Sequence, residues 1–336
     1  MVAPERRVVD EVSGWLRVYD DGSVDRSWVG PPEAKFMVEP VPAHEEFIEG
    51  VATRDVEFRS GSRVRVYMPD TGIGSDPNEK LPVILHFQGG GFCISQADWF
   101  MYYAVYTKLA RLARAIVVSV YLRLAPENRL PAAIDDGFSA LLWLTSLGRG
   151  EAHESWVSNK ADFNRVFLIG DSSGGNLVHE VASRAGKTDL SPLKLAGSIP
   201  IHPGICRVTR SRSELEMPQT PFLTLDMVDK FLSLGLPIGS TKDGPITCPM
   251  GPNAPPLSGL DLPPILYCVA EKDLLIDTNM EFYEALKKAG KDVELFVSHN
   301  MTHSFYLNKM AVDHDPETKA QTKKLFEGIV EFIRKH

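Results

Sequence analysis

The feature that most constrains the fold is a glycine-rich turn between an apolar strand and a helix. Residues 166–169 (VFLI) form an apolar run typical of a buried strand, and residues 170–175 (GDSSGG) follow it directly. A helical pattern over 173–185 comes next. G-x-S-x-G in this strand–turn–helix context is typical of a nucleophile elbow, in which a tight, strained turn exposes Ser172 above a sheet. A glycine- and serine-rich turn that only caps a helix is the alternative, and the presence of both flanking elements favours the elbow.

The elbow belongs to a regular alternation of strand and helix patterns. β-rich runs predict strands at 51–58, 62–68, 82–87, 115–121, 165–169, 195–201, 264–270 and 292–298. Helices are predicted over 99–113, 132–147 and 173–185. The runs at 82–87 and 115–121 are almost continuously apolar, so we place these two strands at the centre of the sheet. The alternation predicts an α/β fold with a mostly parallel sheet of about eight strands, covered by helices on both faces.

Two segments fall outside this alternation. Residues 1–50 mix aromatic residues with prolines and glycines, and residues 205–245 interrupt the alternation between the sixth and seventh strands. In the second segment, apolar residues at positions i, i+3 and i+7 from Leu225 predict an amphipathic helix. An insertion at this point lies over the carboxyl edge of a parallel sheet, where ligands bind. We therefore predict a single domain over 1–336 with a helical lid from 1–50 and 205–245.

Composition and charge narrow the classes of partner. The chain has 336 residues, of which 43% are hydrophobic and 24% charged, as in an ordinary globular protein. The formal net charge of −8 provides no basic surface for a nucleic acid, and it disfavours anionic membranes. No run approaches the roughly 20 apolar residues of a bilayer-spanning helix, and no secretion signal is evident. Four cysteines without metal-type spacing favour reduced thiols and a cytoplasmic location. Whether the chain is a monomer or a homodimer stays open.

A second glycine-rich segment, residues 88–92 (QGGGF), follows the predicted strand 82–87. A tetrahedral intermediate carries a negative oxygen, and backbone N–H groups on a loop without side chains can stabilise it. We expect the N–H groups of Gly89, Gly90 and Ser173 to form such an oxyanion hole, in which one donor is worth about 3 kcal/mol. A phosphate-binding loop would need a Lys-Ser/Thr pair or G-x-G-x-x-G at the start of a helix, and neither is present here.

A serine nucleophile needs a general base, and in this type of fold an acid and then the base follow the nucleophile along the chain. Asp273 comes directly after the predicted strand 264–270, and His303 comes after 292–298. Both residues therefore lie at the carboxyl edge of the sheet, where Ser172 also lies. The predicted catalytic triad is Ser172, Asp273 and His303.

Other histidines and one other aspartate compete for these roles. His86 and His202 lie at or near strand ends but too early or too deep, so we expect structural roles for them. His299 is the nearest rival of His303 and suits a solvent-facing loop position. Asp277 competes with Asp273, but it precedes the helical run 280–288, where it suits an N-cap.

The predicted triad implies a reaction in two halves. Ser172 attacks an ester or lactone carbonyl while His303 accepts its proton, and an activated water later releases the acyl group. Because neutral His303 is the base, the rate should fall as the pH drops through about 6.5. The mechanism requires no metal and no organic cofactor.

Several segments together resemble the hormone-sensitive-lipase-like branch of the α/β-hydrolases and, within it, the plant carboxylesterases. These segments are the glycine loop, 123–127 (RLAPE), 130–133 (LPAA) and the elbow. Residues 9–15 (VDEVSGW), 95–99 (SQADW) and 220–227 (TPFLTLDM) are similar to the carboxylesterase-15-like proteins. The resemblance implies an α/β-hydrolase fold and carboxylesterase activity. The carboxylesterase-15-like branch is associated with hydrolysis of strigolactones, plant hormones that carry a butenolide lactone.

The chain differs from the family pattern in two segments, and the family also suggests functions other than ester hydrolysis. The family usually has histidine at the position of Gln88, and its Y-R-L-A-P-E-H pattern ends here in Asn128. We expect tuned activity, since the amide donors of the loop do not depend on the side chain of Gln88. Gibberellin receptors resemble the same family but lack the catalytic histidine, so the presence of His303 favours an enzyme. A lyase on the same scaffold is a further alternative, whereas a non-catalytic interaction protein would need every motif to fall in this order by chance.

Overall fold

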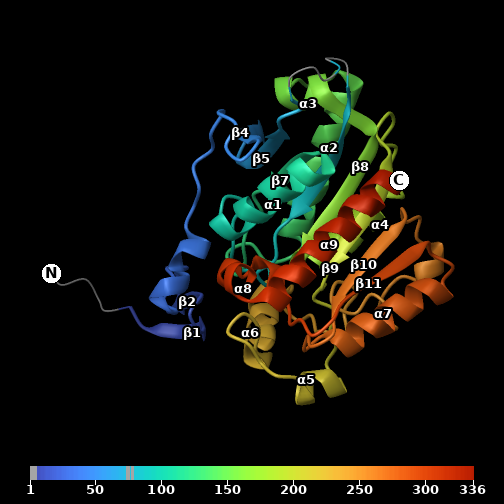
Figure 1. The fold of residues 1–336 in the computed structure, drawn as a ribbon. Coiled ribbons are helices and arrows are strands. Elements are labelled where there is room, and N and C mark those ends of the chain that lie inside the picture. The colour runs from blue at the N-terminus through green and yellow to red at the C-terminus, as the bar shows by residue number, and fades with distance from the viewer. Residues whose placement is uncertain (1–5, 73–75, 77–78) are drawn as a thin grey trace.

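An eight-stranded sheet forms the centre of the protein. The computed structural model describes residues 6–72, 76 and 79–336, so the first five residues of the predicted lid lie outside it. The strand order is β11-β10-β9-β8-β6-β7-β5-β4 (Figure 1). The strands are β4 (Val51–Arg59), β5 (Ser62–Pro69), β6 (Leu81–Phe87), β7 (Ile116–Val120), β8 (Ala161–Asp171), β9 (Leu195–Ile201), β10 (Ile265–Ala270) and β11 (Val293–Ser298). All eight predicted strands are confirmed. Within the described sheet, β5 runs opposite to the other strands and pairs antiparallel with β4 and β7. The remaining pairs are parallel, so the sheet is mostly parallel.

The central strands are buried on both faces. Every residue of β6 and of β7 is buried. Alternate residues of β6 enter different cores, because successive side chains of a strand point to opposite faces. Val83 and Leu85 belong to the core beneath α2 (Ala132–Arg149) and α4 (Ser173–Ala185). Ile84 belongs to the core beneath helices on the other face, so these two strands lie at the centre of the sheet as predicted.

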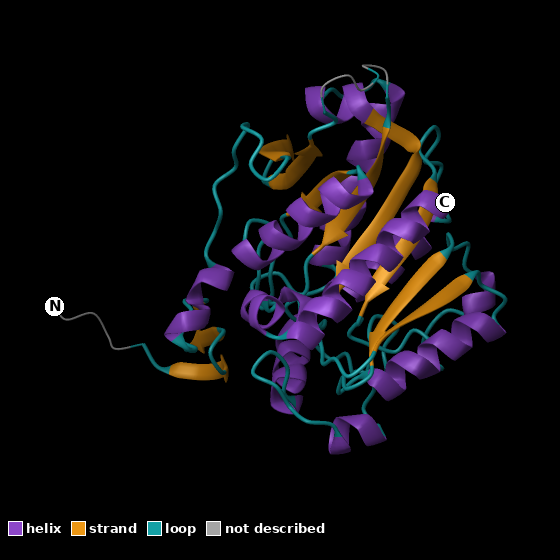
Figure 2. Cartoon of the chain, in the orientation of Figure 1, coloured by secondary structure: helices purple, strands orange, loops and turns teal. Residues whose placement is uncertain are grey.

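Helices enclose the sheet (Figure 2). The helices α1 (Phe100–Ala113) and α9 (Pro316–Lys335) share one core on the face opposite α2 and α4. The remaining helices of the domain are α3 (Ser155–Lys160), α7 (Ile276–Lys288), α8 (Lys309–His314), η2 (Leu257–Gly259) and η3 (Phe305–Leu307). The predicted helices at 99–113, 132–147 and 173–185 are confirmed as α1, α2 and α4. The prediction that Asp277 is an N-cap is wrong, because α7 begins at Ile276 and Asp277 lies within its first turn.

Two separate segments meet over one edge of the sheet. The first contains β1 (Val8–Val12), β2 (Leu16–Tyr19), β3 (Val24–Asp25) and η1 (Pro32–Val38), and the second contains α5 (Arg212–Glu216) and α6 (Leu225–Gly235). Figure 1 shows β1 and β2, in blue, beside α6, in yellow. Trp15 and Leu16 share an apolar cluster with Met227 and Phe231 of α6. The amino group of Lys230 also donates a hydrogen bond to the carbonyl of Glu11, at 2.7 Å. We call these two segments together the cover.

The cysteines and the helices bear on the sequence predictions of reduced thiols and of no membrane-spanning segment. The four cysteines are unpaired and buried. Within residues 6–72, 76 and 79–336, none of the helices has both the length and the hydropathy of a bilayer-spanning segment.

Candidate active site

Ser172 lies at a sharp turn between β8 and α4. Its φ of 51° and ψ of −124° place it in a backbone region that a residue with a side chain rarely adopts, and which stores strain. The turn needs glycine on both sides. A Cβ on Gly170 would lie 2.4 Å from the carbonyl oxygen of Gly174, and a Cβ on Gly174 would lie 2.1 Å from that of Phe87. The glycines of the motif therefore permit the close backbone contacts that hold Ser172 in this conformation.

Asp273 and His303 form a buried pair at the same edge of the sheet. Asp273 follows β10 and His303 follows β11, and the distance from Nδ1 of His303 to Oδ2 of Asp273 is 2.7 Å. The other carboxylate oxygen of Asp273 accepts a hydrogen bond from the N–H of Leu275, at 3.0 Å. Nε2 of His303 has no hydrogen-bond partner among the described residues. His303 and Ser172 line the same pocket. The free Nε2 of His303 can therefore act as a base for Ser172.

Charge interactions within the pair set the protonation of His303. Burial opposes a charge on the imidazole, but the attraction and hydrogen bond of Asp273, with a smaller contribution from Asp171, raise the pKa of His303. Burial likewise opposes a charge on Asp273, yet the attraction of His303 lowers the pKa of that carboxyl. The proton of the pair therefore belongs to the imidazole, and His303 is a stronger base than a free histidine.

The other histidines have structural positions. Nδ1 of His202 accepts a hydrogen bond from the N–H of Ser304 at 3.0 Å, which supports the loop beside His303. Burial lowers the pKa of His202 to about 3, so this ring is neutral. His86 is fully buried and lies 2.7 Å from the hydroxyl of Ser119. His299 is exposed, as expected of a loop residue.

The glycine loop requires one correction to the predicted oxyanion hole. The N–H of Gly89 donates to the hydroxyl of Tyr102 at 3.0 Å and to Oδ1 of Asp171 at 3.3 Å, so it is not free for a substrate. Gly90 and Gly91 line the pocket with Ser173, and no hydrogen bond from their N–H groups to the described residues is found. The N–H groups of Gly90, Gly91 and Ser173 thus have no partner among the described residues, and Gly91 is not among the donors predicted from the sequence.

The side chain of Gln88 lies behind the loop. It is 2% exposed, and neither its amide oxygen nor its amide nitrogen has a partner among the described residues. Gln88 lines a second, smaller cavity together with Gly89, Phe92 and Leu177. Its side chain is therefore not among the groups that line the pocket of Ser172 and His303.

The main pocket has a polar floor and apolar walls. Its empty volume, including the open mouth, is about 820 Å³. The polar residues that line it include Ser172, His303 and Asp171, which lie at or beyond the ends of strands of the sheet, and we call this part of the pocket the floor. The cover supplies wall residues Trp15, Phe222, Leu223, Met227, Val228, Phe231 and Leu232, and the domain supplies Met101, Leu275 and Leu307.

The helix α6 lies directly against the glycine loop. A Cβ on Gly91 would lie 2.3 Å from Cγ of Phe231, so the ring of Phe231 occupies the space where a side chain of residue 91 would stand. The N–H of Leu130 donates to the carbonyl of Gly235 at the end of the helix, at 2.9 Å. The cover therefore contacts the loop that carries the free N–H groups.

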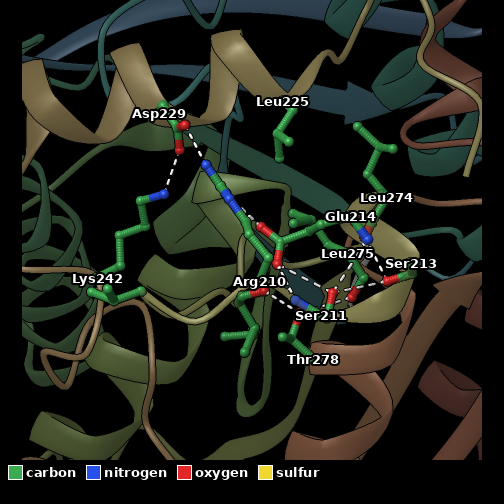
Figure 3. Close-up of polar contacts among 12 residues, drawn as sticks. Arg210, Ser211, Ser213, Glu214, Leu225, Asp229, Lys242, Leu274, Leu275 and Thr278 are labelled. Atoms are coloured by element: carbon green, nitrogen blue, oxygen red, sulfur yellow. Dashed lines mark hydrogen bonds and ion pairs between the residues drawn. The ribbon is translucent and has the colours of Figure 1, made fainter. Parts of the chain in front are cut away.

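Ion pairs connect α6 to the neighbouring helix α5. Figure 3 shows Arg210 between Glu214 and Asp229, with Lys242 also paired to Asp229. The guanidinium of Arg210 lies 2.7 Å from the carboxylate of Glu214, which is completely buried. Asp229 is a residue of α6, so these charges hold the cover helix next to residues 210–214.

The same network reaches the loop that carries Asp273. The hydroxyl of Ser213 donates to the carbonyl of Leu274 at 2.7 Å, and the N–H of Ser213 donates to the carboxylate of Asp277 at 2.8 Å (Figure 3 shows Ser213 and Leu274). The hydroxyl of Thr278 donates to the carbonyl of Leu275 at 3.0 Å. Asp277 thus helps to hold α5 and does not contact His303, which leaves Asp273 as the partner of that histidine.

In the part of the chain that the structure describes, no group of three or more His, Cys, Asp or Glu side chains is placed to hold a metal ion.

Comparisons with known proteins agree with this architecture. Residues 84–307 match the family described as alpha/beta hydrolase fold. The chain is 37% identical over 305 residues to a probable carboxylesterase 6 of Arabidopsis thaliana, which covers 89% of this chain and 85% of that protein. It is also 37% identical over 287 residues to the gibberellin receptor GID1C of Arabidopsis thaliana, with 82% of this chain and 80% of the receptor covered.

Two further similarities bear on the chemistry. A 2-hydroxyisoflavanone dehydratase of Glycyrrhiza echinata is 34% identical over 335 residues, covering 96% of this chain and 95% of that protein. A solved esterase structure from Pyrobaculum calidifontis has a TM-score of 0.66 and 26% identity, covering 85% of this chain and 84% of its own. The expected fold is confirmed, and its relatives include carboxylesterases, receptors and a dehydratase. Since the family match spans most of the sheet and both loops that follow its last strands, the chain belongs to the α/β-hydrolase fold family, as an esterase-type member.

Proposed function

We propose that this protein is a serine carboxylesterase that hydrolyses small-molecule esters or lactones through an acyl-enzyme. The observation that carries the proposal is the buried pair of Asp273 and His303, whose free nitrogen belongs to the pocket of Ser172. A strained serine, a base of raised pKa and unpartnered N–H groups around one cavity are the parts that acyl transfer needs.

Each part has a step in the reaction. The oxygen of Ser172 attacks the carbonyl carbon, and Nε2 of His303 accepts the proton. The carbonyl oxygen becomes an oxyanion that accepts hydrogen bonds from Gly90, Gly91 and Ser173. Collapse of the intermediate expels the alcohol, which takes the proton from His303. A water molecule then attacks the acyl-enzyme by the same steps and releases the acid; in a lactone, the alcohol stays attached to the acyl group.

The walls of the pocket favour an uncharged substrate. No Lys or Arg is among the described residues that line it, while Asp171 lies at its floor. A carboxylate transferred into this pocket would lose its hydration without gaining a cationic partner, which is costly. Neutral esters and lactones are therefore the substrates we propose, and strigolactones are candidates because they are neutral lactones and because residues 9–15, 95–99 and 220–227 resemble the strigolactone-associated branch.

Two measurements test the proposal with wild type and Ser172→Ala. Hydrolysis of a short-chain p-nitrophenyl ester and of a strigolactone should fall by at least about 10³-fold in Ser172→Ala, since the nucleophile is lost. Ser183→Ala is a matched control, because the hydrogen bond that the Ser183 hydroxyl makes to a described residue lies within α4, to the carbonyl of His179. It should keep wild-type rates.

Product masses separate the alternatives. Hydrolysis adds the elements of water to the substrate, whereas the elimination of a dehydratase removes them. Saturable binding of a strigolactone without turnover of any ester would contradict the proposal and favour a receptor.

A further inference from the structure

A buried contact joins the glycine loop to the nucleophile elbow. The N–H of Gly89 lies 3.0 Å from the hydroxyl of Tyr102 and 3.3 Å from Oδ1 of Asp171. The hydroxyl of Tyr102 donates in turn to Oδ2 of Asp171, at 3.3 Å. Tyr102 and Asp171 are each 1% exposed. The three groups thus form a closed set of hydrogen bonds next to Ser172, and we call this set the brace.

The loop and the elbow approach too closely for any side chain at this point. A Cβ on Gly89 would lie 2.4 Å from Oδ2 of Asp171 and 3.1 Å from Cβ of Ser172. Phe92 and Ser173 make a second connection, in which the N–H of Phe92 donates to the hydroxyl of Ser173 at 3.2 Å. The distance between loop and elbow is therefore fixed by direct contacts that lie on both sides of Gly90 and Gly91.

The opposite side of the loop is also held. The hydroxyl of Ser95 donates to the carbonyl of Gly89 at 2.5 Å, and the N–H groups of Cys93 and Ile94 donate to the carbonyl of Gly90. The N–H of Gly89 and the carbonyls of Gly89 and Gly90 are thus bound internally, whereas the N–H groups of Gly90 and Gly91 have no partner among the described residues and can bind a ligand.

The carboxylate of Asp171 has no cationic partner among the described residues. The nearest ring nitrogen is Nε2 of His86, at 3.9 Å. Burial lowers the pKa of His86 in spite of the attraction of Asp171, so the ring is neutral. A buried carboxylate that has hydrogen-bond donors but no cationic partner is costly to a fold, and groups of this kind are typical of functional sites.

We propose that Asp171 and Tyr102 are positioning residues for the reaction, which hold the N–H groups of Gly90, Gly91 and Ser173 at the spacing that one oxyanion requires. This inference rests on the proposed function. Donors stabilise an oxyanion only within about 0.5 Å of the productive geometry, and part of the oxyanion hole lies on the loop while the other part lies on the elbow. The brace is the contact between these two parts.

Tyr102→Phe tests the brace because it removes only the hydroxyl. We expect kcat to fall about 10-fold, less than for loss of a direct donor, while KM stays near wild type. A trifluoromethyl ketone forms a hemiketal oxyanion on Ser172. Its affinity should fall by about the same factor as kcat. Tyr106→Phe is the matched control, since Tyr106 is equally buried on α1, and no hydrogen bond joins it to the described loop. It should leave kcat and inhibitor affinity unchanged.

Asp171→Asn adds a readout that loss of structure would not produce. The titratable groups around His303 are Asp273, His202 and Asp171, and the charge of Asp171 helps to raise the pKa of His303. Asp171→Asn should therefore move the acid limb of kcat/KM to lower pH, whereas Tyr102→Phe should leave the limb in place. Ser95→Ala, which acts on the other side of Gly89, should lower kcat if Tyr102→Phe does not fold.

Different results would overturn the role of the brace and the proposed esterase function. Unchanged kcat in a folded Tyr102→Phe variant, an equal loss in Tyr106→Phe, or a change confined to KM would overturn the brace while hydrolysis by wild type persists. Hydrolysis that survives Ser172→Ala would overturn the proposed function itself.

Discussion

The floor of the pocket and its cover are held by different forces. The floor consists of strand ends and buried hydrogen bonds, such as the 2.7 Å contact of His303 with Asp273. The cover is held by apolar contacts around Trp15 and by ion pairs that are partly exposed, such as Arg210 with Asp229. Buried polar groups have few alternative geometries, whereas ion pairs near solvent contribute little energy. The floor is thus suited to fix the chemistry and the cover to select the substrate.

The largest expected effect lies in the floor. Asp273→Asn should lower kcat by about 10⁴-fold, because the amide neither stabilises the imidazolium nor holds the required tautomer of His303. Asp277→Asn is the matched control, because its carboxylate accepts from Ser213 and does not contact His303. Steady-state kinetics with a p-nitrophenyl ester measure both variants, and a comparable loss in Asp277→Asn would contradict the choice of Asp273.

The pH profile tests the charge of the same pair. Only neutral His303 accepts a proton, so activity is lost as pH falls through its pKa. Asp273 raises that pKa, so the acid limb of kcat/KM should lie above the ordinary histidine value of about 6.5. A limb below this value in a profile from pH 5 to 9 would show that the pair does not act as described.

Substitutions in the cover should change binding more than chemistry. Met227→Ala removes part of the wall from α6, and we expect KM to rise about 5-fold with kcat nearly unchanged. Leu234→Ala is the control on the same helix, since Leu234 is equally buried but does not line the pocket. A fall in kcat for Met227→Ala that equals the rise in KM would mean that cover and floor are not separate in function.

The smallest expected effect on activity concerns the ion pairs of the cover. Arg210→Met leaves Glu214 buried without its cation, which should destabilise the fold by about 1–3 kcal/mol and change kcat little. Arg212→Met is the control, because Arg212 and Glu216 are both exposed, and the melting temperature should stay at the wild-type value. Equal melting temperatures for the two variants would show that the Arg210 pair contributes nothing to stability.

Local patterns predicted the sheet well. Strands such as β6 and β7 appear as continuous apolar runs, and the elbow combines a strand, glycines and a helix between residues 161 and 185. The positions of Asp273 and His303 follow from strand order alone. By contrast, β1 to β3, α8 and α9 were not predicted, although Asp315 and Pro316 form an N-terminal cap signal for α9 that was present in the sequence.

The donors of the glycine loop needed tertiary information. Three consecutive glycines look equivalent in sequence, but the hydroxyl of Tyr102 on α1 occupies the N–H of Gly89. The sequence predicts an N-cap at Asp277 because the helical pattern begins at residue 280, whereas α7 begins four residues earlier, at Ile276. The contact that occupies the N–H of Gly89 comes from Tyr102, 13 residues along the chain, and the N–H that donates to Asp277 comes from Ser213, 64 residues away, so periodicity reveals neither contact.

The ring of Phe231 against Gly91 has a consequence for substrate entry. The helix that roofs the pocket is also the backing of the loop that would receive the developing negative charge. Any motion of the roof that admits a bulky ester would move the ring of Phe231 away from Gly91, while the hydrogen bonds of Gly89 and Gly90 would stay in place. Substrate entry past α6 would therefore disturb one contact of Gly91, whereas the contacts that join the loop to the elbow would be kept.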